Sequence, residues 1–296
     1  MQDKKQIYYK YFEDNILPVI KPFEDYRKRT VIKLILSSVM FFFIGVIFAG
    51  LFIYNALNQL FNPLLLPVLL FFMYVFILKS IVDAILCGKE YQKKLVNEVL
   101  PLFLKPVANF RKWQQGQDVE AIINSKLFPN FDTSEDVLSF FGVYKNVNII
   151  ISDTKLTLPV KASVKPDLFK GAVIQLQLAK SVNNHVIFSS EYLKNPYNRI
   201  KSGSKEFDSQ IFTFVQKTNN LDFINQDLLE VFHKFAQAYS AKSFKMSYKD
   251  DVVVIALKQK NPMQFGFLFR SLTNAKNYDD LIERFIVIYD LIDLLS

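Results

Sequence analysis

The sequence LILSSVMFFFIGVIFAGLFIY (Leu34–Tyr54), followed by NALNQLFN and then PLLLPVLLFFMYVFIL (Pro63–Leu78), decides the fold of this chain. The first run has 21 uncharged residues. At ~1.5 Å of rise per residue it forms a helix of roughly 31 Å, close to the thickness of a bilayer's hydrocarbon core. The second run has 16 uncharged residues and is followed by KSIVDAIL. It reaches spanning length if the helix continues to Leu86 and the Lys79 ammonium extends to the headgroups.

This pattern predicts a transmembrane helical hairpin, with spans at 31–57 and 63–86 and a short external loop at 58–62. Two buried helices of a soluble core are the alternative, which is disfavoured because adjacent runs of this length and apolarity are rare in soluble domains. The positive-inside rule sets the orientation, since Lys and Arg flank both runs and the loop has neither. We therefore expect both termini in the cytoplasm and the protein in a bacterial cytoplasmic membrane. A single cysteine agrees with a cytosolic main body.

The positive charge of the chain gathers beside the two apolar runs. The net charge is +8, but residues 113–296 carry 21 basic and 20 acidic side chains. A nearly neutral main body argues against nucleic-acid binding, and bases beside a span attract anionic lipid headgroups. These headgroups are the expected partner, and the residues predicted at the membrane interface are Arg27, Lys28, Arg29, Lys79, Lys89, Lys93, Lys94, Arg111, Lys112 and Trp113.

Two segments next to the spans are predicted to be helical. Residues 1–30 show an amphipathic pattern, which Pro18 and Pro22 interrupt. This cytosolic segment either lies on the inner leaflet or docks on the protein's own cytosolic domain. Residues 87–115 are predicted as a basic juxtamembrane helix, with Gly116 as the boundary of the next domain.

Residues 116–296 are predicted to form a cytosolic α+β domain with antiparallel hairpins and a C-terminal helix. Strands are expected at 147–152, 155–161, 169–180, 185–189, 211–216, 243–248 and 251–258. Turns are expected at Asp153-Thr154, Asn183-Asn184 and Lys249-Asp250. Helices are expected at 118–124, 225–240 and 278–295, the last capped by Asn277.

Several motifs together resemble a bacterial family of two-span membrane proteins known only as a domain of unknown function. The similar features are the apolar hairpin, LFPNFDTSEDVLSFFGVY at 127–144, Phe-Lys-Gly at 169–171, and EFDSQIFTFVQ at 206–216 followed by a helix. The resemblance covers nearly the whole chain. It implies the two-span topology and a β-rich cytosolic domain, and it implies no activity.

Phe169, Lys170 and Gly171 form the most pointed local feature and are a candidate interaction element. Gly171 could let another backbone approach closely while Lys170 faces an anion, or it could simply open a strand beside a solvated lysine. Three carboxylates within five residues (Asp132, Glu135 and Asp136) could bind a divalent cation, but an acidic loop or helix start explains them equally well.

No motif of catalysis, cofactor binding or metal ligation is found in the sequence. His185 and His233 lack the spaced partners of a zinc site. Cys87 lies at the membrane face without a base nearby in sequence, and Gly203 lacks the context of a phosphate-binding loop. We therefore assign no catalytic, cofactor-binding or metal residues. The sequence favours a membrane-anchored, cytosol-facing binding or scaffold module. The alternatives are an enzyme with an unrecognised site in the α+β domain and an oligomeric pore or transport subunit.

Overall fold

The computed structural model describes residues 2–57, 65–158, 167–193, 197–218, 224–259 and 269–296. The predicted external loop at 58–62 lies outside these ranges. The chain divides into two compact units. The first, called the mixed unit here, comprises Met1–Glu13, Pro101–Gln264 and Tyr278–Ser296, and the second, called the helical unit, comprises Asp14–Leu100 and Phe265–Asn277.

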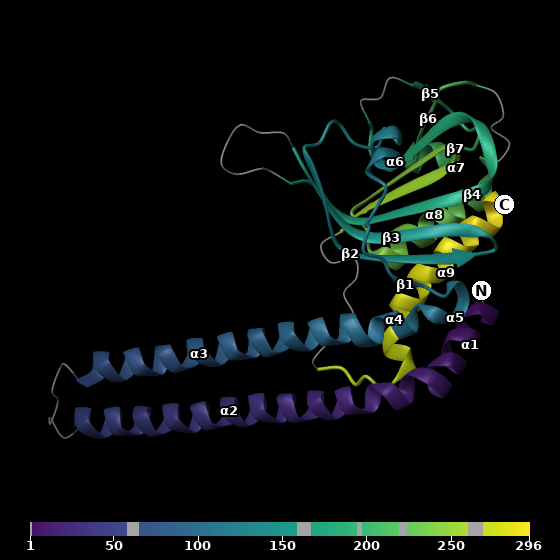
Figure 1. Cartoon of the computed structure of the whole chain (residues 1–296). Coiled ribbons are helices and arrows are strands. Elements are labelled where there is room, and N and C mark those ends of the chain that lie inside the picture. The colour runs from purple at the N-terminus through teal and green to yellow at the C-terminus, as the bar shows by residue number, and fades with distance from the viewer. Residues whose placement is uncertain (1, 58–64, 159–166, 194–196, 219–223, 260–268) are drawn as a thin grey trace. The chain divides into compact units, whose positions relative to one another are not determined.

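The helical unit is built on two long antiparallel helices, α2 (Leu17–Leu57) and α3 (Leu65–Lys94), which lie side by side (Figure 1). Two aromatic pairs fix their register, Tyr26 with Tyr91 at a centroid separation of 6.3 Å and Phe41 with Phe76 at 5.7 Å. A π-helical turn, η2 (Leu95–Val99), continues α3. Within the described residues one helical stretch, Lys4–Leu51, is long and apolar enough to cross a membrane, and none of its most apolar part is buried. The second predicted span coincides with α3 but stays a prediction.

The predicted break at Pro18 and Pro22 does not occur, because α2 runs through Pro22. A π-helical turn, η1 (Phe12–Ile16), instead joins α1 (Gln2–Tyr11) to α2. The wider π turn changes the local hydrogen-bond pattern just before Pro18, where an α-helix would place a proline ring against a carbonyl. The proline pair therefore marks a local adjustment within a continuous helical segment.

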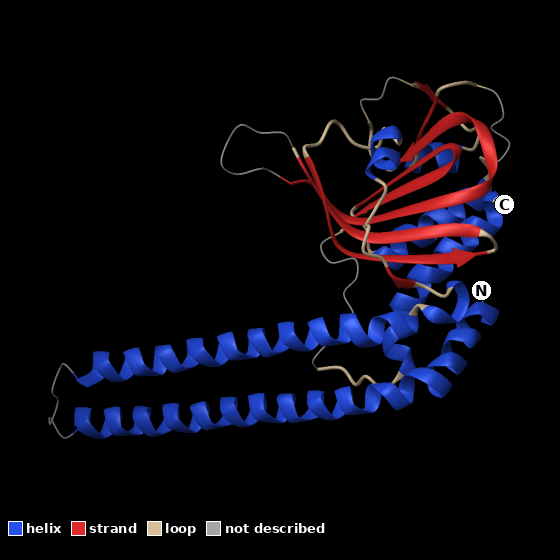
Figure 2. Cartoon of the chain, in the orientation of Figure 1, coloured by secondary structure: helices blue, strands red, loops and turns tan. Residues whose placement is uncertain are grey.

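The mixed unit contains an antiparallel sheet in the order β1-β2-β3-β4-β6-β5, with β7 also paired to β4 (Figure 2). The strands are β1 (Arg111–Lys112), β2 (Thr133–Tyr144), β3 (Val147–Thr157), β4 (Asp167–Ser189), β5 (Asn198–Ile200), β6 (Phe212–Val215) and β7 (Ser243–Lys258). The helices are α1, α4 (Leu100–Phe103, which begins at the unit boundary), α5 (Lys105–Ala108), α6 (Val119–Asn124), α7 (Lys205–Gln210), α8 (Gln226–Tyr239) and α9 (Asp279–Leu295). The 3₁₀ turn η3 (Ala275–Tyr278) precedes α9 and belongs to the helical unit except for its last residue.

The two longest strands reverse direction and are nested. Lys242 N donates to Lys258 O at 2.9 Å, so both ends of β7 lie side by side, and the reversal falls at Asp250, where φ is 54°. The N-terminal arm of β4 pairs with β3 on one edge and with 252–258 on the other. Its C-terminal arm pairs with β6 and with 245–249. The β7 hairpin is therefore inserted between the two arms of β4. The predicted direct pairing of 185–189 with 169–180 is wrong, whereas the β7 hairpin is confirmed.

Both faces of this sheet are covered. Ile187 faces a core with Ile122 of α6, Val173 and Val254. Its neighbour Phe188 faces the other side of the sheet, where its ring centroid lies 5.2 Å from that of Phe232 on α8. Successive strand residues point to opposite faces, so α6 covers one face and α8 the other, and α9 packs beside α8.

A turn, a helix end and a helix cap differ from those predicted from the sequence. β3 runs straight through Asp153-Thr154, because the Thr154 hydroxyl donates to Asp136 Oδ1 on the neighbouring strand at 2.6 Å. The helix expected to reach Gln115 ends at Ala108, where Asn109 adopts φ 45°, and Arg111–Lys112 then pair with β2. Asn277 does not cap α9, since its side chain donates to Ser271 O.

The N-terminal helix α1 docks on the C-terminal helix α9. Lys4 Nζ lies 3.0 Å from Asp290 and 2.8 Å from Asp293, and Lys5 Nζ lies 3.1 Å from Asp279. Beneath these ion pairs, the hydroxyls of Tyr8 and Tyr289 are 3.2 Å apart and buried. Of the two predicted positions for this segment, the structure shows docking on the protein's own domain for residues 2–11.

Candidate functional site

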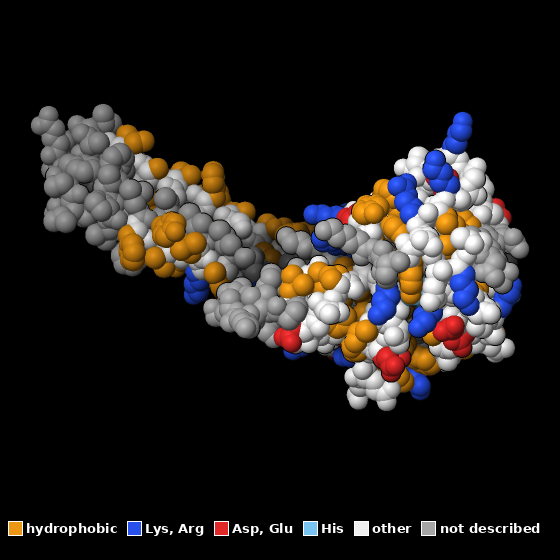
Figure 3. All heavy atoms as spheres, turned by 90° about the horizontal axis from the view of Figure 1, so that it is seen from above, with side chains coloured by type: hydrophobic (Ala, Val, Ile, Leu, Met, Phe, Trp, Pro, Cys, Tyr) orange, Lys and Arg blue, Asp and Glu red, His pale blue; other side chains and the backbone are white. Residues whose placement is uncertain are grey.

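The exposed apolar surface of α2 is the feature of this chain with the clearest functional meaning. Large apolar side chains from Ile32 to Tyr54 are exposed, including Phe42 at 69% and Leu36 at 62%. They cover the broad side of the helix that faces away from Phe41, the residue that contacts Phe76 of α3, so α3 does not cover them. Figure 3 shows such side chains along the helical unit. Exposed apolar surface of this extent marks contact with a membrane or another protein.

On α2, before this apolar surface begins, Glu24 and Arg27 form a largely buried ion pair. Arg27 donates from Nε and Nη2 to the two carboxylate oxygens of Glu24 at 2.9 and 2.8 Å. Glu24 Oε2 also accepts from Leu272 N at 2.9 Å. The Arg27 guanidinium is the main cause that lowers the pKa of Glu24, so the carboxylate stays ionised. This pair fixes the segment around Leu272 to the start of α2.

The residues predicted at the membrane interface do not share one environment. Lys28, Arg29, Lys79, Lys89 and Lys93 are exposed on α2 and α3. Lys94 instead lies 3.1 Å from Glu90 and 5.1 Å above the Tyr26 ring. Arg111, Lys112 and Trp113 belong to the mixed unit, where Trp113 stacks on Phe141 at 5.0 Å and Arg111 lies over both rings. These three residues thus form the edge of the sheet.

The Phe169-Lys170-Gly171 element is part of the sheet packing. Phe169 lies in the core with Phe128, at a centroid separation of 4.9 Å, and Lys170 is exposed. A Cβ on Gly171 would overlap Leu257 O and lie 3.0 Å from Gln259 N. Gly171 therefore permits the close approach of β7. This agrees with the first of the two interpretations of the sequence, in which Gly171 lets another backbone come near. In the structure described, this element brings no anion-binding groups to Lys170.

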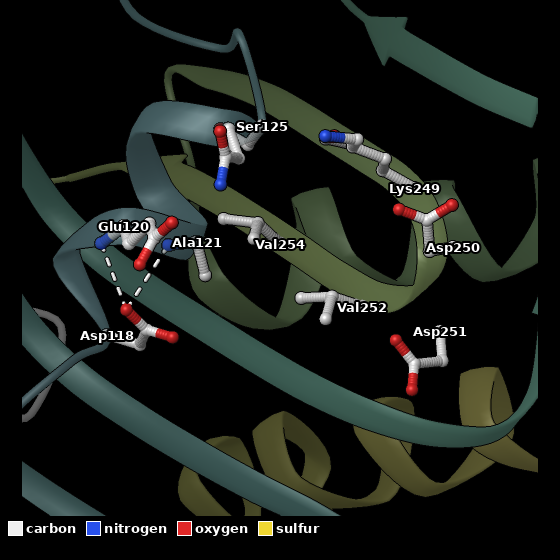
Figure 4. A pocket seen from close by; sticks show the side chains of 11 residues that line it. Asp118, Glu120, Ala121, Ser125, Lys249, Asp250, Asp251, Val252 and Val254 are labelled. Atoms are coloured by element: carbon white, nitrogen blue, oxygen red, sulfur yellow. Dashed lines mark hydrogen bonds between the residues drawn. The ribbon is translucent and has the colours of Figure 1, made fainter.

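A pocket of about 170 Å³ opens between α6 and the turn of β7 (Figure 4). Its walls include Asp118, Glu120, Ser125, Lys249, Asp250 and Asp251, over the apolar Val252 and Val254. Two of the carboxylates already have partners. Asp118 caps α6 by accepting from the N–H groups of Glu120 and Ala121, and Asp251 accepts from Gln177 Nε2 at 2.5 Å.

His185 lies behind this pocket in a satisfied network. Its Nδ1 is 2.8 Å from Tyr197 Oη, and its Nε2 is 2.8 Å from Ser247 Oγ and 3.2 Å from Ser125 O. Because a carbonyl only accepts, we assign the proton to Nε2, which leaves Nδ1 to accept from the tyrosine. Burial lowers the pKa of His185 to about 4, so the ring is neutral at pH 7.

A serine beside a histidine is also the pattern of an activated nucleophile. Here Nε2 carries the proton and cannot take one from Ser247. The Ser247 side chain is also buried at 1% exposure, which keeps it from a substrate. The network therefore holds α6 and its C-terminal turn against the sheet. Sequence reasoning missed it because Ser125 and Ser247 lie about 60 positions away on either side.

The carboxyl groups singled out in the sequence do not converge. Asp136 accepts from Gln117 N and from Thr154 Oγ1, both at 2.6 Å, and so acts as a structural acceptor. Burial raises the pKa of Asp153 to about 6, but Asp153 lies on β3 and does not line the pocket. Within the described residues no group of three or more His, Cys, Asp or Glu side chains could hold a metal ion. His233 is exposed on α8.

No family model and no curated protein matches this sequence. Among solved structures, the chain is similar to the crystal structure of the mycobacterial trehalose monomycolate transport factor A, TtfA, with 12% sequence identity and a TM-score of 0.35. The similarity covers 69% of this chain and 93% of that chain. A similarity at this level supports no inference about function.

Proposed function

We propose that this protein is a membrane-anchored binding or scaffold module, with the helical hairpin in the membrane and the α+β unit on the cytoplasmic side. The exposed apolar surface of α2 carries this proposal. Its length matches a hydrocarbon core, and none of its most apolar part is buried. In water this surface would cost roughly 25 cal/mol for each Å² of apolar area left exposed, whereas lipid covers it without a protein partner.

The second span and the orientation belong to the same proposal. α3 runs antiparallel to α2 and returns the chain to the side from which it entered. Exposed Lys and Arg side chains lie at the end of the hairpin where α2 and α3 continue into the polar parts of the chain. The positive-inside rule assigns such an end to the cytoplasm. Both termini then lie in the cytoplasm.

Site-specific labelling tests this topology. In a Cys87→Ser background, Asn58→Cys should react in intact cells with a membrane-impermeant thiol reagent. Ser202→Cys should react only after the cells are opened. Labelling of Ser202→Cys in intact cells would refute the cytoplasmic placement of the α+β unit, and release of the protein by alkaline carbonate would refute the membrane anchor.

The binding role requires a partner. The intact protein, purified in mild detergent after cross-linking in cells, should enrich the same protein across repeated preparations. If anchoring positions the module for binding, a variant whose hairpin no longer inserts into the membrane should lose the partner. Failure of the intact protein to enrich any protein or lipid above an unrelated two-span control would count against the proposal.

The enzyme alternative gains no support from the geometry. Titratable groups with shifted pKa values that line a pocket would support an enzyme site. Among the described residues, the carboxyl group whose pKa is raised, that of Asp153, lies outside the pocket between α6 and β7, and both ring nitrogens of the buried His185 are hydrogen-bonded. We therefore retain the binding module as the proposed function.

A further inference from the structure

A loop outside the hairpin brings an exposed aromatic side chain to the helical unit. Phe269 is 74% exposed, which is more than Phe42 on the apolar surface of α2 at 69%. It belongs to Phe265–Asn277, the part of the chain between β7 and α9 that is grouped with α2 and α3 in the helical unit. A phenylalanine at this exposure stays in water unless another surface covers it, so its position along α2 decides what that surface is.

Two hydrogen bonds to Glu24 fix this loop to α2. Leu272 N donates to Glu24 Oε2 at 2.9 Å, and Ser271 Oγ donates to Glu24 Oε1 at 3.4 Å. Leu272 is itself buried. Arg27 holds the carboxylate in place, since it donates to both of its oxygens. The loop is therefore held at a defined level of α2, only three residues away from Phe269.

The level of Glu24 lies just outside the exposed apolar surface of α2. This surface begins at Ile32, eight residues after Glu24, and eight helical residues span roughly 12 Å. Phe269 precedes Leu272 by three residues, and an extended chain covers ~3.3 Å for each, so the two residues can be roughly 10 Å apart. The described part of the loop runs beside α2 from the start of α9 toward the C-terminal end of α2 (Figure 2). Phe269 is therefore directed toward the apolar surface and lies close to its beginning.

An aromatic side chain at this level fits the boundary between headgroups and acyl chains. If the exposed surface that begins at Ile32 lies in the hydrocarbon core, the headgroup region extends roughly 5–8 Å from there toward Glu24. Phenylalanine is one of the side chains that peripheral elements bury at this boundary. The position of Phe269 is continuous with the apolar surface of α2, so lipid that covers this surface also reaches the phenylalanine ring.

We infer that Phe269 is an interfacial membrane anchor outside the hairpin, an inference that rests on the proposed membrane anchoring. Its ring inserts between the lipid headgroups and contacts the upper part of the acyl chains. Glu24 and Arg27 do not contact lipid in this arrangement but position the loop that carries Phe269. Because the loop leads directly into η3 and α9, this contact connects the C-terminal part of the chain to the bilayer surface, in addition to the two helices of the hairpin.

Tryptophan fluorescence in brominated lipid tests this contact. The chain has one tryptophan, Trp113, whose emission is measured in the wild type and subtracted. Full-length Phe269→Trp, Phe42→Trp and Val19→Trp are each reconstituted in phosphatidylcholine that carries bromine either near the headgroup or near the ends of the acyl chains. Phe42 and Val19 are matched controls, because both are exposed apolar residues of α2. Phe42 lies roughly 15 Å beyond Ile32, near the bilayer centre, and Val19 lies roughly 20 Å before it.

We expect Phe269→Trp to emit at a shorter wavelength than Val19→Trp and to lose more of its emission to bromine near the headgroup than to bromine near the chain ends. Phe42→Trp should show the opposite order, and neither lipid should quench Val19→Trp. An unquenched Phe269→Trp would overturn the inference at either wavelength: a long wavelength places the side chain in water, and a short one means that protein covers it. Equal quenching of Phe269→Trp and Val19→Trp would also overturn it, because any exposed tryptophan would then attract lipid.

The Phe42→Trp variant separates this inference from the proposed function. Quenching of Phe42→Trp without quenching of Phe269→Trp disproves the Phe269 contact and leaves the membrane anchor intact. A Phe42→Trp protein that neither lipid quenches refutes the anchor itself, on which the inference rests. All three substitutions replace exposed side chains, so each variant should unfold at the same temperature as the wild type.

Discussion

Replacement of Gly171 by alanine should destabilise the mixed unit strongly, although it adds a single methyl group. The new Cβ would overlap Leu257 O and lie 3.0 Å from both Leu257 C and Gln259 N. These are backbone atoms of β7, so no side chain can rotate away to make room. The two strands must separate, which disturbs the bond from Gln259 N to Lys170 O.

The expected cost follows from two contributions. Overpacking in a well-packed site costs ~1–3 kcal/mol, and weakening a buried hydrogen bond adds ~1 kcal/mol. A total of about 3 kcal/mol lowers the melting temperature of a domain of this size by roughly 6–12 °C. Thermal unfolding of the full-length protein in detergent, followed by near-ultraviolet circular dichroism, measures this change.

Lys170→Ala is the matched control, because it changes the neighbouring position on the same strand but removes an exposed side chain. Its melting temperature should stay close to that of the wild type. If Gly171→Ala unfolds at the same temperature as the wild type, Gly171 is not needed for the approach of β7. A large loss in Lys170→Ala alone would instead revive the interaction element predicted from the sequence.

Three further changes test other parts of the structure. Lys4→Glu with Lys5→Glu places like charges against α9, so hydrogen exchange in α1 should accelerate by about tenfold, whereas Lys10→Glu, at an exposed position, should leave it unchanged; equal exchange in both would refute the docking. The pKa of His185 is lowered from 6.5 to about 4, so the unfolded chain binds a proton in this window that the folded chain does not; stability to urea should fall as the pH falls from 6.5 to 4, and His185→Gln should flatten this dependence. The pKa of Asp153 is raised from 3.8 to about 6, so this group lowers stability as the pH rises through that window; Asp153→Asn should stabilise the protein at pH 7 by about 1–2 kcal/mol, and an unchanged urea midpoint would show that Asp153 is solvated.

The sequence predicted those elements whose signals are local. The apolar run at Leu34–Tyr54 forms part of α2, and α8 begins after Asn225, whose side chain accepts from Leu228 N at 3.0 Å. Asp118 caps α6 in the same way. In each case the residues that define the element lie within a few positions of one another. Periodicity and capping chemistry were therefore sufficient.

Strand partners could not be predicted in the same way. The alternation in β4 indicates a strand, but it does not say which strand occupies each edge. Asn183-Asn184 favoured a direct hairpin, and the structure instead inserts β7, which comes more than 50 residues later, between the arms of β4. Asp153-Thr154 resembled a turn because both residues are polar. The partner that keeps Thr154 in a strand, Asp136, is on β2.

The candidate sites also could be predicted only where the signal lies within a few positions in the sequence. The close-approach role of Gly171 followed from its position at a strand start, since glycine is the residue that permits such contact. The His185 network could not be predicted, because its partners lie on α6, β7 and the segment near β5. The separation of Arg27 from Lys28 also needed the structure, since only the Glu24–Arg27 distances show that one of two adjacent bases is neutralised.

The docking of α1 changes which charges can attract the membrane. Residues 1–30 contain seven basic side chains, and an interfacial helix would have used Lys4 and Lys5 for lipid. Both ammonium groups instead bind carboxylates of α9, and Tyr8 is buried against Tyr289. A helix that uses two of its three lysines and an aromatic side chain in docking retains little for the bilayer surface. Under the proposed anchoring, attraction to anionic lipid would therefore fall to the exposed bases of the helical unit.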